Sequence, residues 1–420
     1  MSIDFSLFLW YHSYNYTSIV FMRCVMEYNF SKKLAQLKPS AIREIFKSLT
    51  DPEIISLAAG NPSPESFPTE ELARISADIF ASCPNLALQY GITEGYTPLR
   101  EAVAKRQKER FGIGKDGDLV MIVSGGQQGI ELACKALCNE GDVVICEEPS
   151  FIGALNSFRS NGAKTVGVEL EDDGISIEKL EAALKEHKNA KLLYLIPTFQ
   201  NPTGITASLE KRRAIMELAS KYDIMILEDN PYGELRFKGE DVPTLKSMDT
   251  EGRVIYCSSF SKILSAGMRV GFVVANEKVL SKMAVAKQGE DVHTNVFFQL
   301  LCHRYMTECD LDAHIAKINS IYLRKCDLML DAIDKYIPAD KVTFTRPEGG
   351  LFIWGTVKDC TDVSPIIKKL IEKKVAVVPG SAFLCDTEGT SGCFRLNYST
   401  PTDEQIVEGV RRIGAVFSEL

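Results

Sequence analysis

The chain reads Ser258-Ser259-Phe260-Ser261-Lys262-Ile263-Leu264-Ser265-Ala266-Gly267-Met268-Arg269-Val270-Gly271 between two apolar runs, residues 254–257 and 271–275, that have the composition of buried strands. A lysine placed among hydroxyl and apolar side chains loses solvation, which favours its neutral and nucleophilic amine. Arg269 is the kind of side chain that binds a phosphate through two hydrogen bonds. A lysine in a polar surface turn is the simpler interpretation, but the flanking apolar runs argue against it. The stretch therefore predicts a reactive lysine beside an anion site.

Around this stretch, short β-rich apolar runs alternate with helical patterns, which is typical of a mostly parallel sheet covered by helices. Residues 208–222 carry apolar side chains at helical spacing behind Ser208, a favoured N-cap. The other candidate strands are residues 119–123, 143–146, 192–196 and 224–227. A smaller α+β domain is predicted after about residue 310 from a long helical pattern and short strands near residues 342–344, 351–354, 376–378 and 394–397. The expected fold class is α/β, with a mostly parallel central sheet in a large domain plus this smaller domain.

Polar residues follow several of these strands, at the sheet edge where open α/β sheets bind ligands. The glycine-rich turn of residues 124–129 leads into a helix whose first N–H groups could bind a phosphate, although such turns are also common for packing reasons. Asp229 follows a strand and could hold a proton on a heterocyclic nitrogen, or it could cap the turn before Pro231. Asn201-Pro202 favours a turn whether or not a ligand is present.

Composition restricts the class of ligand. With 45% hydrophobic and 25% charged residues, the sequence is typical of a soluble globular protein, and 420 residues exceed one typical core. A net charge of −8 gives no general attraction to nucleic acid or to an anionic membrane, so small molecules are the expected ligands. The 12 cysteines include no Cys-x-x-Cys pair, and several lie in apolar runs. We interpret them as reduced thiols of a cytoplasmic protein, without a metal site.

The first 25 residues differ from the rest of the chain. They are rich in aromatic and apolar residues, but Tyr, His and Asn interrupt them and no cationic segment precedes them, as a signal peptide would require. From Met26 onward the sequence is that of an ordinary cytoplasmic start. Residues 1–25 are therefore predicted to be an atypical extension, upstream of the natural start. Mass spectrometry of the native N-terminus tests this, and a mature chain that begins at Met1 would refute it.

Five motifs together give the chain a family resemblance. They are Ser-x-Ser-Lys-x6-Arg around Lys262, Asn201-Pro202-Thr203-Gly204, Asp229-x-x-Tyr232, Gln89-Tyr90-Gly91 and Phe394-Arg395-Leu396. From about Leu57 to Tyr398 the chain resembles the fold-type I pyridoxal-5′-phosphate (PLP) enzymes, in particular class I/II aminotransferases of the aromatic and 2-aminoadipate (kynurenine aminotransferase II-like) branch. This resemblance implies a large PLP-binding domain of residues 68–310. It implies a small domain formed by residues 311–420, to which residues 26–67 contribute.

The resemblance also implies roles around the cofactor ring. Lys262 is expected to carry PLP as a Schiff base and to move the proton at the substrate Cα. Asp229 is expected to pair with the pyridinium nitrogen, and Asn201 and Tyr232 to contact the phenolic oxygen. Phe151 stands where this branch stacks an aromatic side chain on the ring. A tyrosine is commoner there, so the stacking is kept while a hydroxyl is lost.

The remaining implied roles concern the phosphate and the substrate. Tyr90 resembles a tyrosine that reaches the phosphate of the neighbouring subunit, which implies a homodimer with shared active sites. Arg395 is expected to bind the substrate α-carboxylate, and Gly60 and Asn201 to contact the substrate. Within one chain, the expected phosphate ligands are Ser259, Ser261, Arg269, Gly126 and Gln127.

The implied activity is transfer of an amino group between an L-amino acid and a 2-oxo acid such as 2-oxoglutarate. The amino acid is expected to be aromatic, branched-chain or 2-aminoadipate-like. A PLP-dependent carbon–sulfur β-lyase would use the same lysine, aspartate and arginine. A PLP-sensing regulatory module is the third alternative. It needs a basic N-terminal domain, whereas only some 25 residues of little positive charge precede the region of resemblance.

Overall fold

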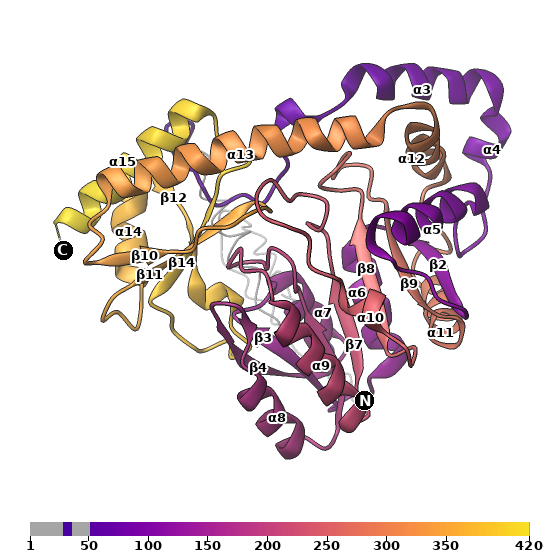
Figure 1. Ribbon diagram of the computed structural model, residues 1–420, viewed down its shortest axis with the longest axis horizontal. Helices are drawn as coiled ribbons and strands as arrows, with labels where there is room; N and C mark the ends of the chain where they lie inside the picture. Colours follow the sequence, from indigo (N-terminus) through magenta and orange to yellow (C-terminus); the bar gives the residue numbers. More distant parts are fainter. Residues whose placement is uncertain (1–27, 36–50, 420) are drawn as a thin grey trace, which may run out of the picture.

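The computed structural model describes residues 28–35 and 51–419 (Figure 1). The predicted extension of residues 1–25 lies outside this part. Within it, the order of the eight-stranded central sheet is β2-β9-β8-β7-β6-β3-β4-β5. These strands are β2 (Asp118–Val123), β3 (Val143–Glu148), β4 (Lys164–Glu171), β5 (Gly174–Ile175), β6 (Ala190–Leu195), β7 (Met225–Asp229), β8 (Val254–Ser259) and β9 (Gly271–Asn276).

The sheet is mostly parallel, as predicted. Five consecutive strands of the sheet are parallel to one another, in the order β8-β7-β6-β3-β4. Strand β9 is antiparallel to both of its neighbours, β2 and β8. All six predicted strands of this domain are present, but β4 and the short β5, which pairs antiparallel with it, were not predicted. The carboxyl ends of β6, β7 and β8 therefore meet at one edge.

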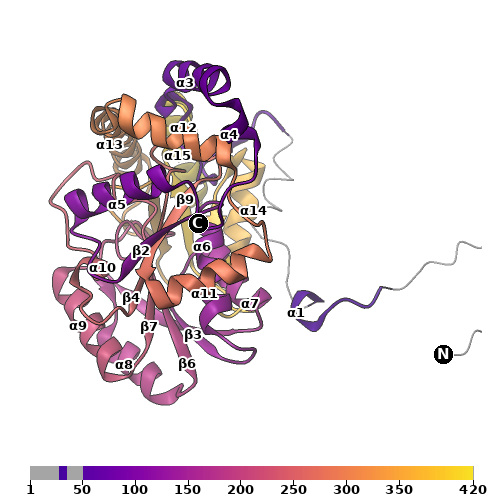
Figure 2. The ribbon, with the colours of Figure 1, turned by 90° about the vertical axis from the view of Figure 1, so that its right-hand side faces the viewer.

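Both faces of the sheet are buried. Successive side chains of a strand point to opposite faces, and each face packs against its own hydrophobic core. Cys146 and Tyr194 pack in one core with α6 (Gly126–Leu137), α7 (Ile152–Ser160) and α11 (Glu277–Gln288). Ile145 and Leu193 pack in the other with α8 (Ile177–Glu186), α9 (Leu209–Lys221) and α10 (Leu245–Met248). Figure 2 shows the sheet between these two groups of helices. The predicted cap of α9 is confirmed, since Ser208 Oγ accepts a hydrogen bond from Lys211 N at 3.2 Å.

A second, smaller unit combines both ends of the described chain. Strand β1 (Ile55–Ser56) pairs in parallel with β12 (Val375–Ala376). An antiparallel sheet has the order β10 (Val342–Phe344), β11 (Phe352–Val357), β14 (Cys393–Asn397) and β13 (Val378–Pro379). The long helix α13 (Leu311–Tyr336) crosses the top of the molecule in Figure 1 and packs beside α15 (Asp403–Ser418). The remaining helices are α1 (Lys32–Ala35), η1 (Pro64–Ser66), α3 (Thr69–Ser82), α4 (Pro84–Leu88), α5 (Thr97–Phe111), α12 (Val296–Glu308), α14 (Ser364–Glu372) and η2 (Gly380–Phe383).

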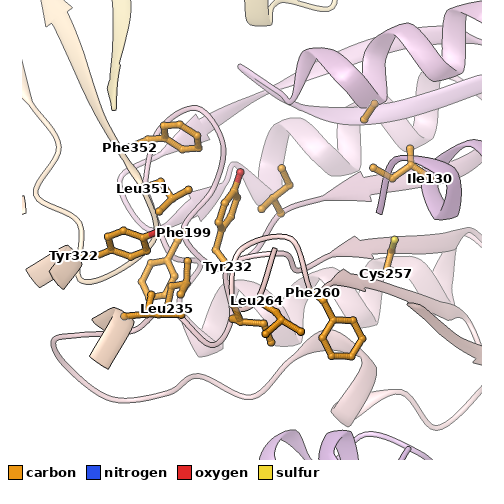
Figure 3. Close-up of a cluster of buried hydrophobic side chains, with 14 of the residues drawn as sticks. Ile130, Phe199, Tyr232, Leu235, Cys257, Phe260, Leu264, Tyr322, Leu351 and Phe352 are labelled. Atoms are coloured by element: carbon orange, nitrogen blue, oxygen red, sulfur yellow. The ribbon is translucent and has the colours of Figure 1, made fainter. Parts of the chain in front are cut away.

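The two units meet through apolar side chains next to the Lys262 stretch. Tyr232, just after β7, makes an edge contact with Phe352 of β11, with the ring centroids 5.9 Å apart. Figure 3 shows Tyr232 between Phe352 on one side and Leu264 and Phe260, which flank Lys262 in sequence, on the other. This packing fixes the small unit against the carboxyl ends of the large sheet. No helix in the described ranges is long and apolar enough to cross a membrane.

Candidate active site

A cavity of about 380 Å³ lies where the large sheet ends and the small unit begins. With the exception of Tyr90, every site residue predicted from the sequence lines it. They are Gly60, Gly126, Gln127, Phe151, Asn201, Asp229, Tyr232, Ser259, Ser261, Lys262, Arg269 and Arg395. Six further residues complete the lining: Asn61, Ile130, Ile196, Pro231, Ala266 and Phe352.

Lys262 extends into this cavity from the loop between β8 and β9. Its Nζ donates a hydrogen bond to the carbonyl oxygen of Gly60 at 2.6 Å. Burial of the amine and the positive charges of Arg395 and Arg269 lower the pKa of Lys262 to about 8. With this pKa, about a tenth of the amine is neutral at pH 7 and about half at pH 8, and the neutral amine is the form that acts as nucleophile or base.

Asp229 occupies the last position of β7 and is 4% exposed. Burial raises its pKa to about 7, and the hydrogen bond that Tyr194 Oη donates to Asp229 Oδ2, at 2.8 Å, opposes this rise. A positive group bound in the cavity would hold this carboxyl in its charged form. Tyr194 was not singled out in the sequence, because a tyrosine inside an apolar strand resembles an ordinary core residue.

Arg395 reaches the cavity from β14 of the small unit. Its Nη1 donates to Asn201 Oδ1 and its Nη2 to the carbonyl of Ala58, both at 2.8 Å. Its Nε is buried and has no hydrogen-bond partner among the described residues. The guanidinium lies 4.2 Å from the ring centroid of Phe352. Burial lowers the pKa of Arg395 to about 10, so the side chain stays cationic and has a spare donor for a carboxylate.

A set of donors suited to a phosphate lies at the start of α6. The helix begins at Gly126, and the first N–H groups of a helix have no acceptor within it. Ser259 Oγ and Ser261 Oγ are 2.7 Å apart, and Arg269 Nη2 lies 3.4 Å from the carbonyl of Ser124. A Cβ at Gly125, where φ is +81°, would lie 2.3 Å from Arg269 Nη2, so this approach requires glycine. The hydroxyls, amides and guanidinium fit a dianionic phosphate.

Two buried residues, Glu147 and Gln200, connect the loops on either side of the cavity. Glu147 Oε2 accepts hydrogen bonds from Ile196 N at 3.0 Å and Gln200 Nε2 at 3.4 Å. Gln200 Nε2 also donates to the carbonyl of Pro149 at 2.7 Å, and Gln200 Oε1 accepts from Thr203 N at 2.9 Å. These bonds tie the segment before Phe151 to the Asn201 turn. Sequence patterns did not point to either residue.

Tyr90 is the predicted site residue that lies elsewhere. Its side chain is 82% exposed and contacts His293 edge-on, with the ring centroids 5.7 Å apart. The described chain therefore does not bring Tyr90 into its own cavity. The role expected for it in the site of a neighbouring subunit remains a prediction.

Comparisons with known proteins agree with this arrangement. Residues 52–413 match the family model "Aminotransferase class I and II". The chain is 41% identical to aromatic-amino-acid aminotransferase 1 of Thermococcus litoralis, over 93% of this chain and 94% of that protein. It is 37% identical to the 2-aminoadipate transaminase of Thermus thermophilus, over 93% of this chain and 97% of that protein.

A comparison with solved structures also identifies an aminotransferase. The crystal structure of Pyrococcus horikoshii kynurenine aminotransferase, a complex with PMP, superposes with a TM-score of 0.89 at 40% identity and covers 93% of this chain and 97% of that one. The family expected from the sequence motifs is thereby confirmed, together with its fold type I architecture. The chain belongs to the class I and II aminotransferase family and is a PLP-dependent transaminase.

Proposed function

We propose that this transaminase takes aromatic or 2-aminoadipate-like L-amino acids as donors and a 2-oxo acid such as 2-oxoglutarate as acceptor. The observation that carries this proposal is the cavity around Lys262. It combines the buried guanidinium of Arg395, which has a spare donor, with three aromatic rings. Phe352 lies beside that guanidinium, and Phe151 and Tyr232 lie beside the position proposed for PLP. Such a site fits a molecule with a carboxylate at one end and an aromatic side chain at the other. The 2-aminoadipate-like class, whose side chain ends in a second carboxylate, is proposed from the name of the Thermus relative. The names of the relatives from Thermococcus and Thermus support the same substrate classes.

The residues of the cavity fit PLP. The first amides of α6 at Gly126 and Gln127, the hydroxyls of Ser259 and Ser261, and Arg269 would bind the phosphate. Asp229 would pair with the ring nitrogen, and Asn201 and Tyr232 would contact the phenolic oxygen. Phe151 would pack against the ring. When bound, PLP supplies an electron sink for the pair left at the substrate Cα after its proton is removed.

Lys262 is proposed to hold the cofactor and to move the proton at the substrate Cα. Its lowered pKa of about 8 is close to the operating pH, where a general base is most effective. The carbonyl of Gly60, 2.6 Å from Nζ, gives the amine a fixed partner when it is not covalently bound. Arg395 Nη2 donates to the carbonyl of Ala58, two residues before Gly60. Lys262 and Arg395 therefore bind the same backbone segment.

The pKa of Lys262 makes a testable prediction for the cofactor-free protein. The neutral amine is the form that attacks the aldehyde of PLP, so the rate of PLP binding is expected to rise with pH and to level off above about pH 8. A lysine with an ordinary pKa of about 10.4 would instead give a rate that still rises above about pH 9. Rapid-mixing absorbance measurements across this range distinguish the two. A continued rise would contradict a buried amine.

Arg395 is expected to bind the substrate α-carboxylate and so to set which Cα bond is broken. Arg395→Lys keeps the charge but loses the planar fork, and it should lower kcat/KM by about 10- to 100-fold, the worth of one charge-assisted hydrogen bond. The loss should appear mainly in KM for the amino acid, with PLP affinity nearly unchanged. Arg411→Ala, on the exposed side of α15, is the control. Equal kcat/KM in Arg395→Lys and wild type would refute the assignment.

A panel of amino acids with 2-oxoglutarate tests the proposed substrates. Aromatic amino acids and 2-aminoadipate are expected to shift the absorbance of the bound cofactor to that of pyridoxamine phosphate. Turnover should then continue only when an oxo acid is added. Release of pyruvate and sulfide from cysteine or cystathionine without any oxo acid would identify a β-lyase instead and overturn the proposal.

We also propose a homodimer in which Tyr90 enters the partner's cavity. Tyr90 stands in a run of exposed apolar side chains, together with Leu86, Leu88, Ile92 and the nearby Val292. Such a patch on a soluble enzyme favours an interface. The cytoplasm is the proposed location, on the sequence argument that cysteines in apolar runs are reduced thiols.

Mixing Lys262→Ala with a Tyr90→Ala variant of reduced activity tests the shared site. In a Lys262→Ala and Tyr90→Ala heterodimer, one cavity contains both native residues. Unfolding and refolding an equal mixture should therefore restore up to about a quarter of the wild-type sites, as symmetric dimers exchange subunits at random. Each variant treated alone is the control. No recovery in a mixture shown by mass to contain heterodimers would contradict a shared site.

A further inference from the structure

A second cavity, much smaller, shares a wall with the cofactor cavity. Its volume is about 10 Å³. Pro231 and Ser259 line both cavities. Gln107 of α5, Asn230 and Tyr256 of β8 line only the smaller one. Whatever occupies this space therefore lies directly behind the residues assigned to PLP.

Two buried amide oxygens in this cavity lack a hydrogen bond. Gln107 is 3% exposed and Asn230 is 2% exposed. Gln107 Oε1 and Asn230 Oδ1 have no partner anywhere in the described part of the chain. Asn230 Nδ2 already donates to Tyr256 Oη at 3.1 Å. Turning the Asn230 amide would exchange its two atoms but would still leave one of them without a partner. Buried polar atoms of this kind are normally satisfied by protein or by ordered water.

We propose that the cavity binds one ordered water molecule, which donates one hydrogen bond to Gln107 Oε1 and the other to Asn230 Oδ1. The volume corresponds to about one water, and internal cavities that stay empty are lined by apolar groups. A metal cation fits less well. The two free oxygens are neutral, and the carboxylate of Glu234, which also lines the cavity, is already paired with Arg106 through Nε at 3.0 Å.

The position of this water gives it a part in the active site. Asn230 follows Asp229 directly, and its backbone is already held by Cys257 O, which accepts from Asn230 N, and by Ser258 Oγ, which donates to Asn230 O, both at 2.8 Å. The water would connect the Asn230 side chain to Gln107 of α5, so that both the backbone and the side chain of Asn230 are held in place. Gln107 and Asn230 are then positioning residues for Asp229. This consequence rests on the proposed role of Asp229, whereas the presence of the water does not.

A crystal structure of the PLP-bound enzyme, at a resolution that shows ordered water, tests the site. The expected result is a density peak within hydrogen-bonding distance of the side-chain amides of both Gln107 and Asn230. Three results would overturn it: a dry cavity, a direct bond between the two amides, or a peak that gains anomalous signal after a rubidium soak. None of them depends on what Asp229 does.

The positioning role is tested with Gln107→Met, which keeps the side-chain length but removes the acceptor. Loss of one hydrogen bond should weaken PLP binding by about 2- to 10-fold and lower kcat. Gln288→Met, the same change on the exposed surface of α11, should alter neither quantity. A lower melting temperature with unchanged PLP affinity and kcat would mean that the water serves only stability, and the link to Asp229 would be wrong.

Discussion

Lys262→Ala is expected to lower kcat by about 10⁴-fold or more, because in the proposed assignment one substitution removes both the covalent attachment of PLP and the general base. The absorbance band of the lysine-bound cofactor should disappear, while circular dichroism and the melting temperature of the cofactor-free protein should stay close to wild type. Steady-state kinetics and absorbance spectra measure these effects.

Two comparisons make this result specific. Lys262→Arg keeps a positive charge but has no nucleophilic amine, so it should be as inactive as the alanine variant. Lys282→Ala, on the exposed side of α11, should behave as wild type. Turnover by Lys262→Ala within about tenfold of wild type would mean that another group carries the chemistry.

Asp229→Asn should have the second largest effect, a loss of about 10²- to 10³-fold in kcat. The amide has nearly the same shape and can still bond to Tyr194, but it cannot supply the negative charge that we propose holds a proton on the cofactor ring nitrogen. PLP should still bind, with lower affinity. Kinetics together with a PLP titration separate the two effects.

The preceding residue of β7 offers a matched control. Glu228 is also a buried carboxyl, but it accepts hydrogen bonds from Leu245 N and Lys246 N, at 3.0 and 2.7 Å, instead of lining the cavity. Glu228→Gln is therefore expected to change stability more than kcat. Equal losses of kcat in the two variants would indicate a general structural effect and would refute the special role of Asp229.

Much of the fold could be predicted from the sequence because buried parallel strands are continuous apolar runs. Strand β4 was missed for the opposite reason. It is near the sheet edge, most of its side chains are only partly buried, and Gly167 in its middle accommodates the side chain of Glu148. The antiparallel direction of β9 could not be predicted either, since the side-chain pattern of a buried strand is the same in both directions.

The site was predictable where its residues lie at or just beyond the ends of strands, as Asp229 does at the end of β7 and Lys262 does three residues after β8. Arg395 was found only through its motif, because its contact with Asn201 joins residues 194 positions apart. The supporting residues Tyr194, Glu147 and Gln200 carried no such signal. Their function follows from which atoms they contact, and only the folded chain shows those contacts.

The most direct test of the account is to reduce the PLP-bound enzyme with borohydride, digest it and locate the modified residue by mass spectrometry. The account predicts a pyridoxyl group on the peptide that contains Lys262, and no comparable modification of other lysines. A modification centred on a different lysine, or none at all in an active preparation, would contradict it.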